Sequence, residues 1–110
     1  MKIILSDKVL NKFVEGEYIT PSDEGEAIAI ACGHFLATGK RADVYMSADG
    51  FCNAMNFFTS YVMPEKIEMN LTISTGRKES SHKVMTDILP ELLELLNYDT
   101  KRIYINIVQR

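Results

Sequence analysis

The chain has 110 residues, of which 46% are hydrophobic and 25% are charged, proportions typical of a globular domain. This length fits a single domain, residues 1–110, and excludes a second hydrophobic core. The net charge of −3 and the scattered basic residues argue against nucleic-acid binding, which requires clustered Lys and Arg. No segment is long and apolar enough for a transmembrane helix or a secretory signal, so we expect a cytoplasmic protein with no membrane partner. In that compartment Cys32 and Cys52 are expected to be reduced and buried.

Short apolar runs alternate with helical patterns along the chain. In order, they predict a strand at 3–5, a helix at 6–14, a strand at 18–20, a helix at 24–38, a strand at 43–47, a helix at 51–61, a strand at 69–74, a helix at 82–96 and a strand at 102–108. Ser22 or Asp23 is expected to cap the helix at 24–38, and Gly39 to end it. The clearest helical stripe is formed by Val84, Ile88, Leu92 and Leu95.

This alternation predicts an α/β fold in three layers, with a mostly parallel sheet and helices on both faces. In such sheets ligands bind beyond the carboxyl ends of the strands. Three polar loops meet that condition, at residues 21–24, 48–53 and 75–82. The sequence therefore predicts a functional edge where these loops meet.

Several motifs fall on this edge and on the helix at 24–38. Residues 19–31 read Ile-Thr-Pro-Ser-Asp-Glu-Gly-Glu-Ala-Ile-Ala-Ile-Ala, residues 33–40 read Gly-His-Phe-Leu-Ala-Thr-Gly-Lys, residues 44–46 read Val-Tyr-Met, and residues 50–56 read Gly-Phe-Cys-Asn-Ala-Met-Asn. In the same order these segments resemble the N-E-G-x-A-[VI]-A-[IL]-A, G-x-x-L-A-T-G-K, V-Y-M and G-L-G-N-A-x-N stretches of a known domain. It is the pyrimidine-binding (PYR) domain of the thiamine diphosphate-dependent phosphonopyruvate and sulfopyruvate decarboxylases. Residues 79–82 are weakly similar to the family's E-P-Q-H, and residues 6–13 to its P-D-S-L-L-K-x-F.

The chain departs from the family pattern at a few places. It begins at the first strand, where family members carry a leading helix, so we expect a PYR-type fold without that helix. Asp23 stands where the family has an Asn before the key glutamate, and Phe57 replaces the proline of N-P-L-T. These changes leave the glutamate at Glu24 in place but leave the identity of the substrate open.

The resemblance implies one half of an active site. In this family the cofactor, thiamine diphosphate, binds between a PYR domain and a diphosphate- and magnesium-binding (PP) domain, and in split enzymes the latter is a separate subunit. Glu24 would be the catalytic carboxyl that hydrogen-bonds N1′ of the aminopyrimidine and activates the cofactor, which supplies the electron sink for decarboxylation of an anionic 2-oxoacid. Mg²⁺ would be held by the PP partner and no metal by this chain. A homo- or hetero-oligomer follows, with the face around Phe57, Phe58 and Tyr61 as a candidate contact surface.

Other residues are candidates for binding, each with a simpler explanation. Asp23, Gly50 and Asn53 are expected at the cofactor, since glycine lets a backbone approach a ligand closely. A helix-capping turn with Asp49 as the cap explains the segment around Gly50 equally well. By the resemblance, His82 and Arg77 would contact the substrate; a capping or surface position for His82 and a solvated surface charge for Arg77 are the alternatives.

Two other classes of function remain open at this stage. The chain could be a catalytically inactive PYR-like scaffold or regulatory subunit of such an enzyme. It could instead be an unrelated α/β binding module, in which Glu24 only stabilises the N-terminus of a helix electrostatically.

Overall fold

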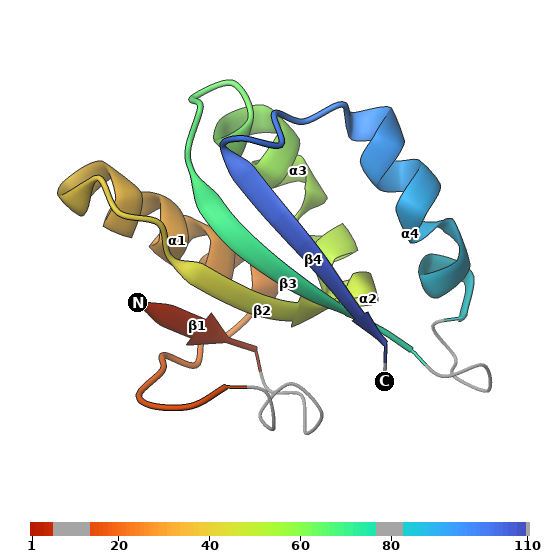
Figure 1. Cartoon of the computed structure of the whole chain (residues 1–110), viewed down its shortest axis with the longest axis horizontal. Coiled ribbons are helices and arrows are strands. Elements are labelled where there is room, and N and C mark those ends of the chain that lie inside the picture. The colour runs from red at the N-terminus through yellow and green to blue at the C-terminus, as the bar shows by residue number, and fades with distance from the viewer. Residues whose placement is uncertain (6–13, 77–82, 110) are drawn as a thin grey trace.

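Four parallel strands form one sheet in the order β1-β2-β3-β4 in the computed structural model of the chain, which describes residues 1–5, 14–76 and 83–109 (Figure 1). The strands are β1 (Lys2–Ile4), β2 (Asp43–Ser47), β3 (Met69–Thr75) and β4 (Ile103–Gln109). The prediction of an α/β fold with a parallel sheet is confirmed. The bounds predicted for these four strands differ from the observed ones by one residue at most.

The register of the sheet places one row of apolar side chains over the core. Val44 of β2 lies opposite Ile3 and Leu71, and Leu71 lies opposite Ile105. Ile3, Val44 and Leu71 are fully buried among helix residues. Because side chains alternate across a strand, Tyr45 and its neighbours in register point to the other face of the sheet.

All helices of the described residues belong to one layer. They are α1 (Glu24–Thr38), α2 (Ala48–Asn53), α3 (Met55–Phe57), the π-helical turn η2 (Phe58–Val62) and α4 (Lys83–Leu96). Helix α2 contacts both α1 and α4, and Figure 1 shows the helices following one another along the sheet. Right-handed crossover connections that all run in the direction from β1 to β4 place their helices on the same face of the sheet, in agreement with this arrangement. The prediction of helices on both faces is therefore confirmed for one face, and most of the helix predicted at 6–14 falls outside the described residues.

The predicted strand at 18–20 is reduced to one parallel bridge between Ile19 and Ile3. Ile19 accepts a hydrogen bond from the N–H of Ile4 and donates one to the carbonyl oxygen of Lys2, both 2.9 Å long. Since β2 occupies one side of β1, this bridge lies on the other side. The connection that follows β1 thus places Ile19 on one side of β1, and the next connection, through α1, places β2 on the other side. The gap between the carboxyl ends of β1 and β2 is a topological switch point, the usual ligand site of such sheets.

Local caps explain where the helices begin and end. Helix α1 has the predicted bounds, with Asp23 as its N-cap and Gly39, in the left-handed conformation at φ 72°, as its C-cap. Helix α2 begins three residues earlier than predicted, directly after β2, because the Ser47 side chain caps it by accepting a 3.2 Å hydrogen bond from the N–H of Gly50. The predicted helix at 51–61 is interrupted at Ala54 and ends in the η2 turn. None of the helices in the described ranges has both the length and the apolarity needed to cross a bilayer.

Helix α4 buries a different face from the one expected. Its buried residues are Leu89 and Leu93, whereas Val84 and Leu95 of the predicted stripe are 71% and 81% exposed. The helix is apolar around more than half of its circumference, so periodicity alone did not select the face that packs on the sheet. The predicted stripe is instead a surface of the molecule.

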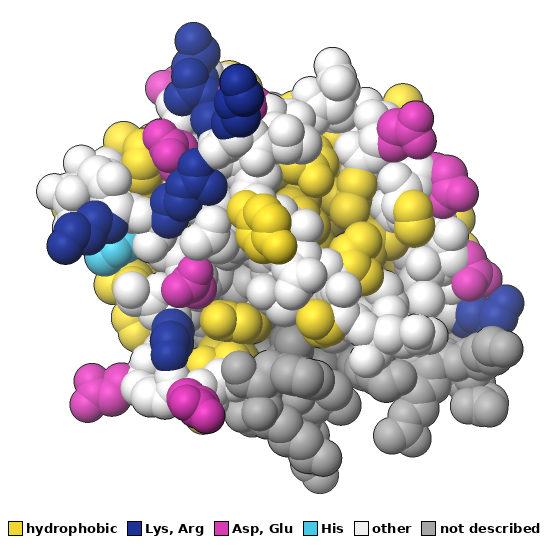
Figure 2. All heavy atoms as spheres, viewed as in Figure 1, with side chains coloured by type: hydrophobic (Ala, Val, Ile, Leu, Met, Phe, Trp, Pro, Cys, Tyr) yellow, Lys and Arg dark blue, Asp and Glu magenta, His cyan; other side chains and the backbone are white. Residues whose placement is uncertain are grey.

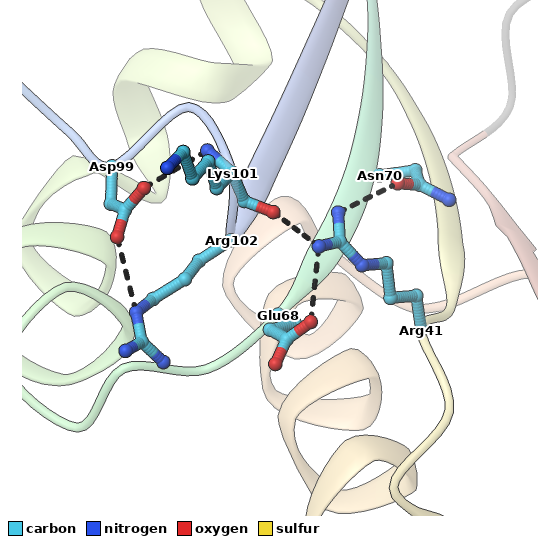
Figure 3. A network of polar contacts seen from close by, with 6 residues as sticks. All are labelled: Arg41, Glu68, Asn70, Asp99, Lys101 and Arg102. Carbon is cyan, nitrogen blue, oxygen red and sulfur yellow. Dashed lines mark hydrogen bonds and ion pairs between the residues drawn. The ribbon is translucent and has the colours of Figure 1, made fainter.

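A polar network joins the amino ends of the strands, opposite the predicted functional edge (Figure 3). The guanidinium of Arg41, just before β2, donates hydrogen bonds to Glu68 (3.0 Å), to Asn70 of β3 (3.4 Å) and to the carbonyl oxygen of Lys101. Arg41 and Glu68 are about one-third exposed, so their charge pair itself contributes little in water. The hydrogen bonds of Arg41 instead connect three segments that are far apart in the sequence, so the role of Arg41 is structural.

The turn that leads into β4 is held by Asp99 at the same edge (Figure 3). Its carboxylate accepts hydrogen bonds from the backbone N–H of Lys101 (2.9 Å) and from Nε of Arg102 (3.2 Å), and these bonds lower the pKa of Asp99. A hollow of about 160 Å³ beside this turn is lined by Val62, Met63, Lys66, Ile67, Asn97, Tyr98, Asp99, Arg102 and Ile103. It contains none of the predicted site residues.

Candidate functional site

Three carboxylates lie at the start of α1, and two of them are used to cap the helix. Oδ1 of Asp23 accepts a 2.7 Å hydrogen bond from the N–H of Glu26. The Glu26 carboxylate in turn accepts hydrogen bonds from the hydroxyl (2.7 Å) and the N–H (3.2 Å) of Ser22. This reciprocal arrangement resembles a capping box and satisfies backbone donors that a helix N-terminus leaves unpaired.

The third carboxylate, that of Glu24, takes no part in the cap. Glu24 is the first residue of α1 and is half-buried. Within residues 1–5, 14–76 and 83–109, no hydrogen bond or ion pair reaches its side chain. The positive end of the helix dipole favours a negative charge at this position. Glu24 is thus the carboxylate of this turn that remains available to a ligand.

The side chain of Glu24 is held against the backbone of Gly50 in α2. A Cβ atom placed on Gly50 would lie 2.7 Å from Oε1 of Glu24, 2.8 Å from its Cγ and 3.1 Å from its Cδ. Contacts below 3.0 Å are essentially never made by real Cβ atoms, so a larger residue at position 50 would displace the carboxylate. The sequence predicted that Gly50 lets the backbone approach a ligand, and in the structure the group that lies against it is the Glu24 side chain.

This contact brings together two of the three loops predicted to form the functional edge. Glu24 ends the loop at 21–24, and Gly50 lies in the first turn after the carboxyl end of β2. Gly50 therefore lies on the β2 side of the switch point, and Glu24 reaches it from the loop that follows Ile19. Asn53 follows Gly50 by three residues in α2, which places it on the same helix face one turn further along, and it is exposed. Of the capping alternatives for α2, Ser47 rather than Asp49 is the N-cap.

The residues next to Glu24 and Gly50 form the apolar core. Ala27 and Ile28, one turn further along α1, are fully buried, and so is Phe51, which follows Gly50. Phe51 packs edge-on against Phe58, with ring centroids 5.2 Å apart. The start of α1, which carries Glu24, is therefore supported from below by tightly packed core residues.

Several sequence predictions are corrected or remain open. Phe58 is fully buried and Phe57 stacks on Tyr61, so this face is largely part of the core rather than a free contact surface. Cys32 is buried as expected, and burial raises the pKa of its thiol to about 11, but Cys52 is exposed.

Arg77 and His82 lie outside the described residues, and their assignment to the substrate stays a prediction. Asp23 is exposed, and its Oδ1 serves the helix cap. No group of three His, Cys, Asp or Glu side chains that could hold a metal is found in the described part of the chain.

The sequence matches no protein-family model, and it matches no curated protein significantly.

Proposed function

We propose that this chain is the pyrimidine-binding subunit of a split thiamine diphosphate-dependent 2-oxoacid decarboxylase, with a PYR-type fold and with Glu24 as the carboxyl that activates the cofactor. The observation that carries the proposal is the Glu24 carboxylate, which has no partner among the described residues and lies against Gly50 beside a topological switch point. The motif resemblance independently selects the same residue.

The arrangement fits an aminopyrimidine on three counts. A ring nitrogen needs one carboxyl group in hydrogen-bonding reach, and Glu24 is the free carboxylate of its turn. The buried apolar core beneath it supports the start of α1, and Asn53 on the same side of α2 offers an amide for a further hydrogen bond. When bound, thiamine diphosphate supplies the electron sink for loss of CO₂. This chain's contribution is to hold a proton-sharing carboxyl group at one fixed position.

The second half of the site comes from another chain in this proposal. A cytoplasmic PP subunit would bind the diphosphate and Mg²⁺, and the substrate would be an anionic 2-oxoacid of the phosphonopyruvate or sulfopyruvate type. A catalytically inactive scaffold for such a subunit is the alternative, and the same experiment separates the two.

The test is CO₂ release by the complex of this chain with a PP subunit, in the presence of thiamine diphosphate, Mg²⁺ and sulfopyruvate or phosphonopyruvate. Glu24→Gln should lower turnover by at least about 10²-fold, in the range attributed to general acid–base groups. Glu26→Gln is the matched control, because this carboxylate belongs to the same helical turn but serves the cap. Turnover by Glu24→Gln equal to that of Glu26→Gln would refute the role of Glu24. Complex formation without any turnover by the native chain would favour the scaffold.

A further inference from the structure

The outer edge of β4 is free of any partner strand in the described part of the chain. β4 pairs with β3 alone, at the end of the sheet. The N–H of Met69 donates to the carbonyl oxygen of Arg102, so the even-numbered residues of this segment direct their backbone groups toward β3. The odd-numbered residues, 103, 105, 107 and 109, direct theirs outward. The N–H of Ile103 already donates to the carbonyl oxygen of Asp99, so the open row of donors and acceptors runs from the carbonyl oxygen of Ile103 to Gln109.

This edge lacks the features that normally prevent strand pairing. Residues 103–109 read Ile-Tyr-Ile-Asn-Ile-Val-Gln, with no charged residue and no proline. Natural edge strands are usually short or interrupted by Lys, Pro or a bulge. A long neutral strand rich in β-branched residues is instead a template for another strand.

An apolar surface lies beside this edge. The exposed hydrophobic residues of α4 and β4 are Val84 (71%), Ile88 (44%), Leu95 (81%), Tyr104 (58%) and Ile107 (42%). Figure 2 shows hydrophobic side chains gathered in the region that β4 and α4 occupy in Figure 1. The inward-facing residues of a strand added beside β4 would therefore pack against apolar side chains.

We propose that the occupant of this edge is a second copy of the chain, with the two β4 strands paired antiparallel about a two-fold axis at Asn106. In this register all seven residues of β4 find partners, and the outward backbone groups of Ile105 and Ile107 pair with those of Ile107 and Ile105 of the second copy. On the other face Tyr104 meets Val108 of the second copy, and the two Asn106 amides meet each other. A shift of the axis by one residue would instead oppose Tyr104 to Asn106, or Val108 to Asn106.

The size of the surface suits a closed dimer. The five exposed apolar side chains, with Tyr104 on the opposite face of the sheet from Ile107, together expose on the order of 400–600 Å² per copy. Together with the backbone edge they approach the roughly 800 Å² per partner of a standard interface. The pairing is self-complementary, and at the opposite end of the sheet the outer side of the short strand β1 already carries the Ile19 bridge, so the assembly closes at two copies. Glu24, on the β1 and β2 side, stays accessible.

The axis can be tested by disulfide formation in a Cys52→Ser background, which removes the exposed native thiol. Asn106→Cys would face its own copy across the axis as a non-hydrogen-bonded pair, about 4.5 Å apart at Cα, and should form a disulfide-linked dimer under mild oxidation. Tyr104→Cys is the control, since it is on the same face and exposed but lies four strand positions from its own copy, roughly 13 Å. Equal crosslinking of both variants would overturn the register.

The dimer itself is tested by sedimentation of the native chain. We expect a two-copy species that Ile107→Lys shifts to the monomer, because a charged side chain facing inward on an edge strand blocks pairing. Leu36→Lys, at a residue of α1 that is 63% exposed and distant from β4 in the sheet order, should leave the dimer unchanged, and circular dichroism should show both variants folded. A native chain that stays monomeric, or one that forms open-ended assemblies, would overturn the proposal.

Discussion

Replacing Gly50 by alanine tests the contact that positions Glu24. An added Cβ would lie 2.7 Å from Oε1 and 2.8 Å from Cγ of Glu24, so the carboxylate would have to retreat by roughly 0.5 Å or adopt another rotamer. Such a displacement leaves the backbone of both helices in place. The expected effect is therefore local and falls on the free carboxylate.

The magnitude follows from two opposing terms. Alanine is preferred over glycine within a helix by about 0.5–1 kcal/mol, and residue 50 lies inside α2. Steric overlap in a packed region costs about 1–3 kcal/mol. Gly50→Ala should thus lower the free energy of unfolding by between about 0 and 2.5 kcal/mol in the native background. In a Glu24→Ala background the side chain that the new Cβ would contact is absent, so Gly50→Ala should stabilise the chain by about 0.5–1 kcal/mol.

The assay is a double-mutant cycle of urea unfolding on this chain alone, with the native protein, both single variants and the double variant. We expect a coupling free energy of about 1–3 kcal/mol between positions 24 and 50. Loss of the favourable charge at the helix terminus in Glu24→Ala cancels in the cycle. Additive effects, within about 0.5 kcal/mol, would show that the two residues are not in contact and would refute the reasoning.

Three further outcomes follow from the structure. Asp23→Ala should destabilise the chain by about 0.5–2 kcal/mol in urea unfolding through loss of the α1 cap, whereas Asp23→Asn should cost less; equal costs would contradict the capping role. Arg41→Met should destabilise by about 1–3 kcal/mol, mainly because Glu68, Asn70 of β3 and the turn before β4 lose their donor, and an unchanged unfolding midpoint would contradict that role. In the folded chain a thiol reagent at pH 8 should modify Cys52 and spare Cys32, whose pKa of about 11 leaves about one thiol in a thousand ionised. Because folding raises the pKa of Cys32 from 9.0, the contribution of its protonated thiol to the free energy of unfolding is full below about pH 9 and is lost toward pH 11. Cys32→Ala should therefore lose less stability than the native chain between about pH 9 and pH 11.

The parts of the fold that local chemistry determines could be predicted from the sequence. Helix α1 has the predicted bounds because its N-cap, Asp23, and its left-handed C-cap, Gly39, act within one turn of the helix ends. The start of α2 was missed because Asp49-Gly50 is a frequent turn signal. Here Ser47 caps the helix, and the glycine is required by a side chain 26 residues away in the sequence. A long-range packing constraint of this kind leaves no local pattern.

The same limit explains α4 and the candidate site. The spacing of Val84, Ile88 and Leu95 correctly indicated a helix, but Leu89 and Leu93 offered a competing face, and packing against α2 and the core decided which face is buried. At the site, the importance of Glu24 and Gly50 came from motif resemblance, whereas their mutual contact came from the structure alone. The sequence analysis also did not predict that Asp23 and Glu26 cap α1 while Glu24 does not. The Asp-x-x-Glu spacing from Asp23 to Glu26 matches a capping box and could have indicated these roles.

The most direct test of the central claim is the rate at which the C2 proton of thiamine diphosphate exchanges with deuterium in the complex with a PP subunit, measured by quenched-flow NMR. If Glu24 activates the aminopyrimidine, Glu24→Gln should slow this exchange by at least about 10²-fold, while Glu26→Gln should leave it within a factor of a few of the native rate. An exchange rate in Glu24→Gln equal to that of the native complex would contradict the assignment of Glu24.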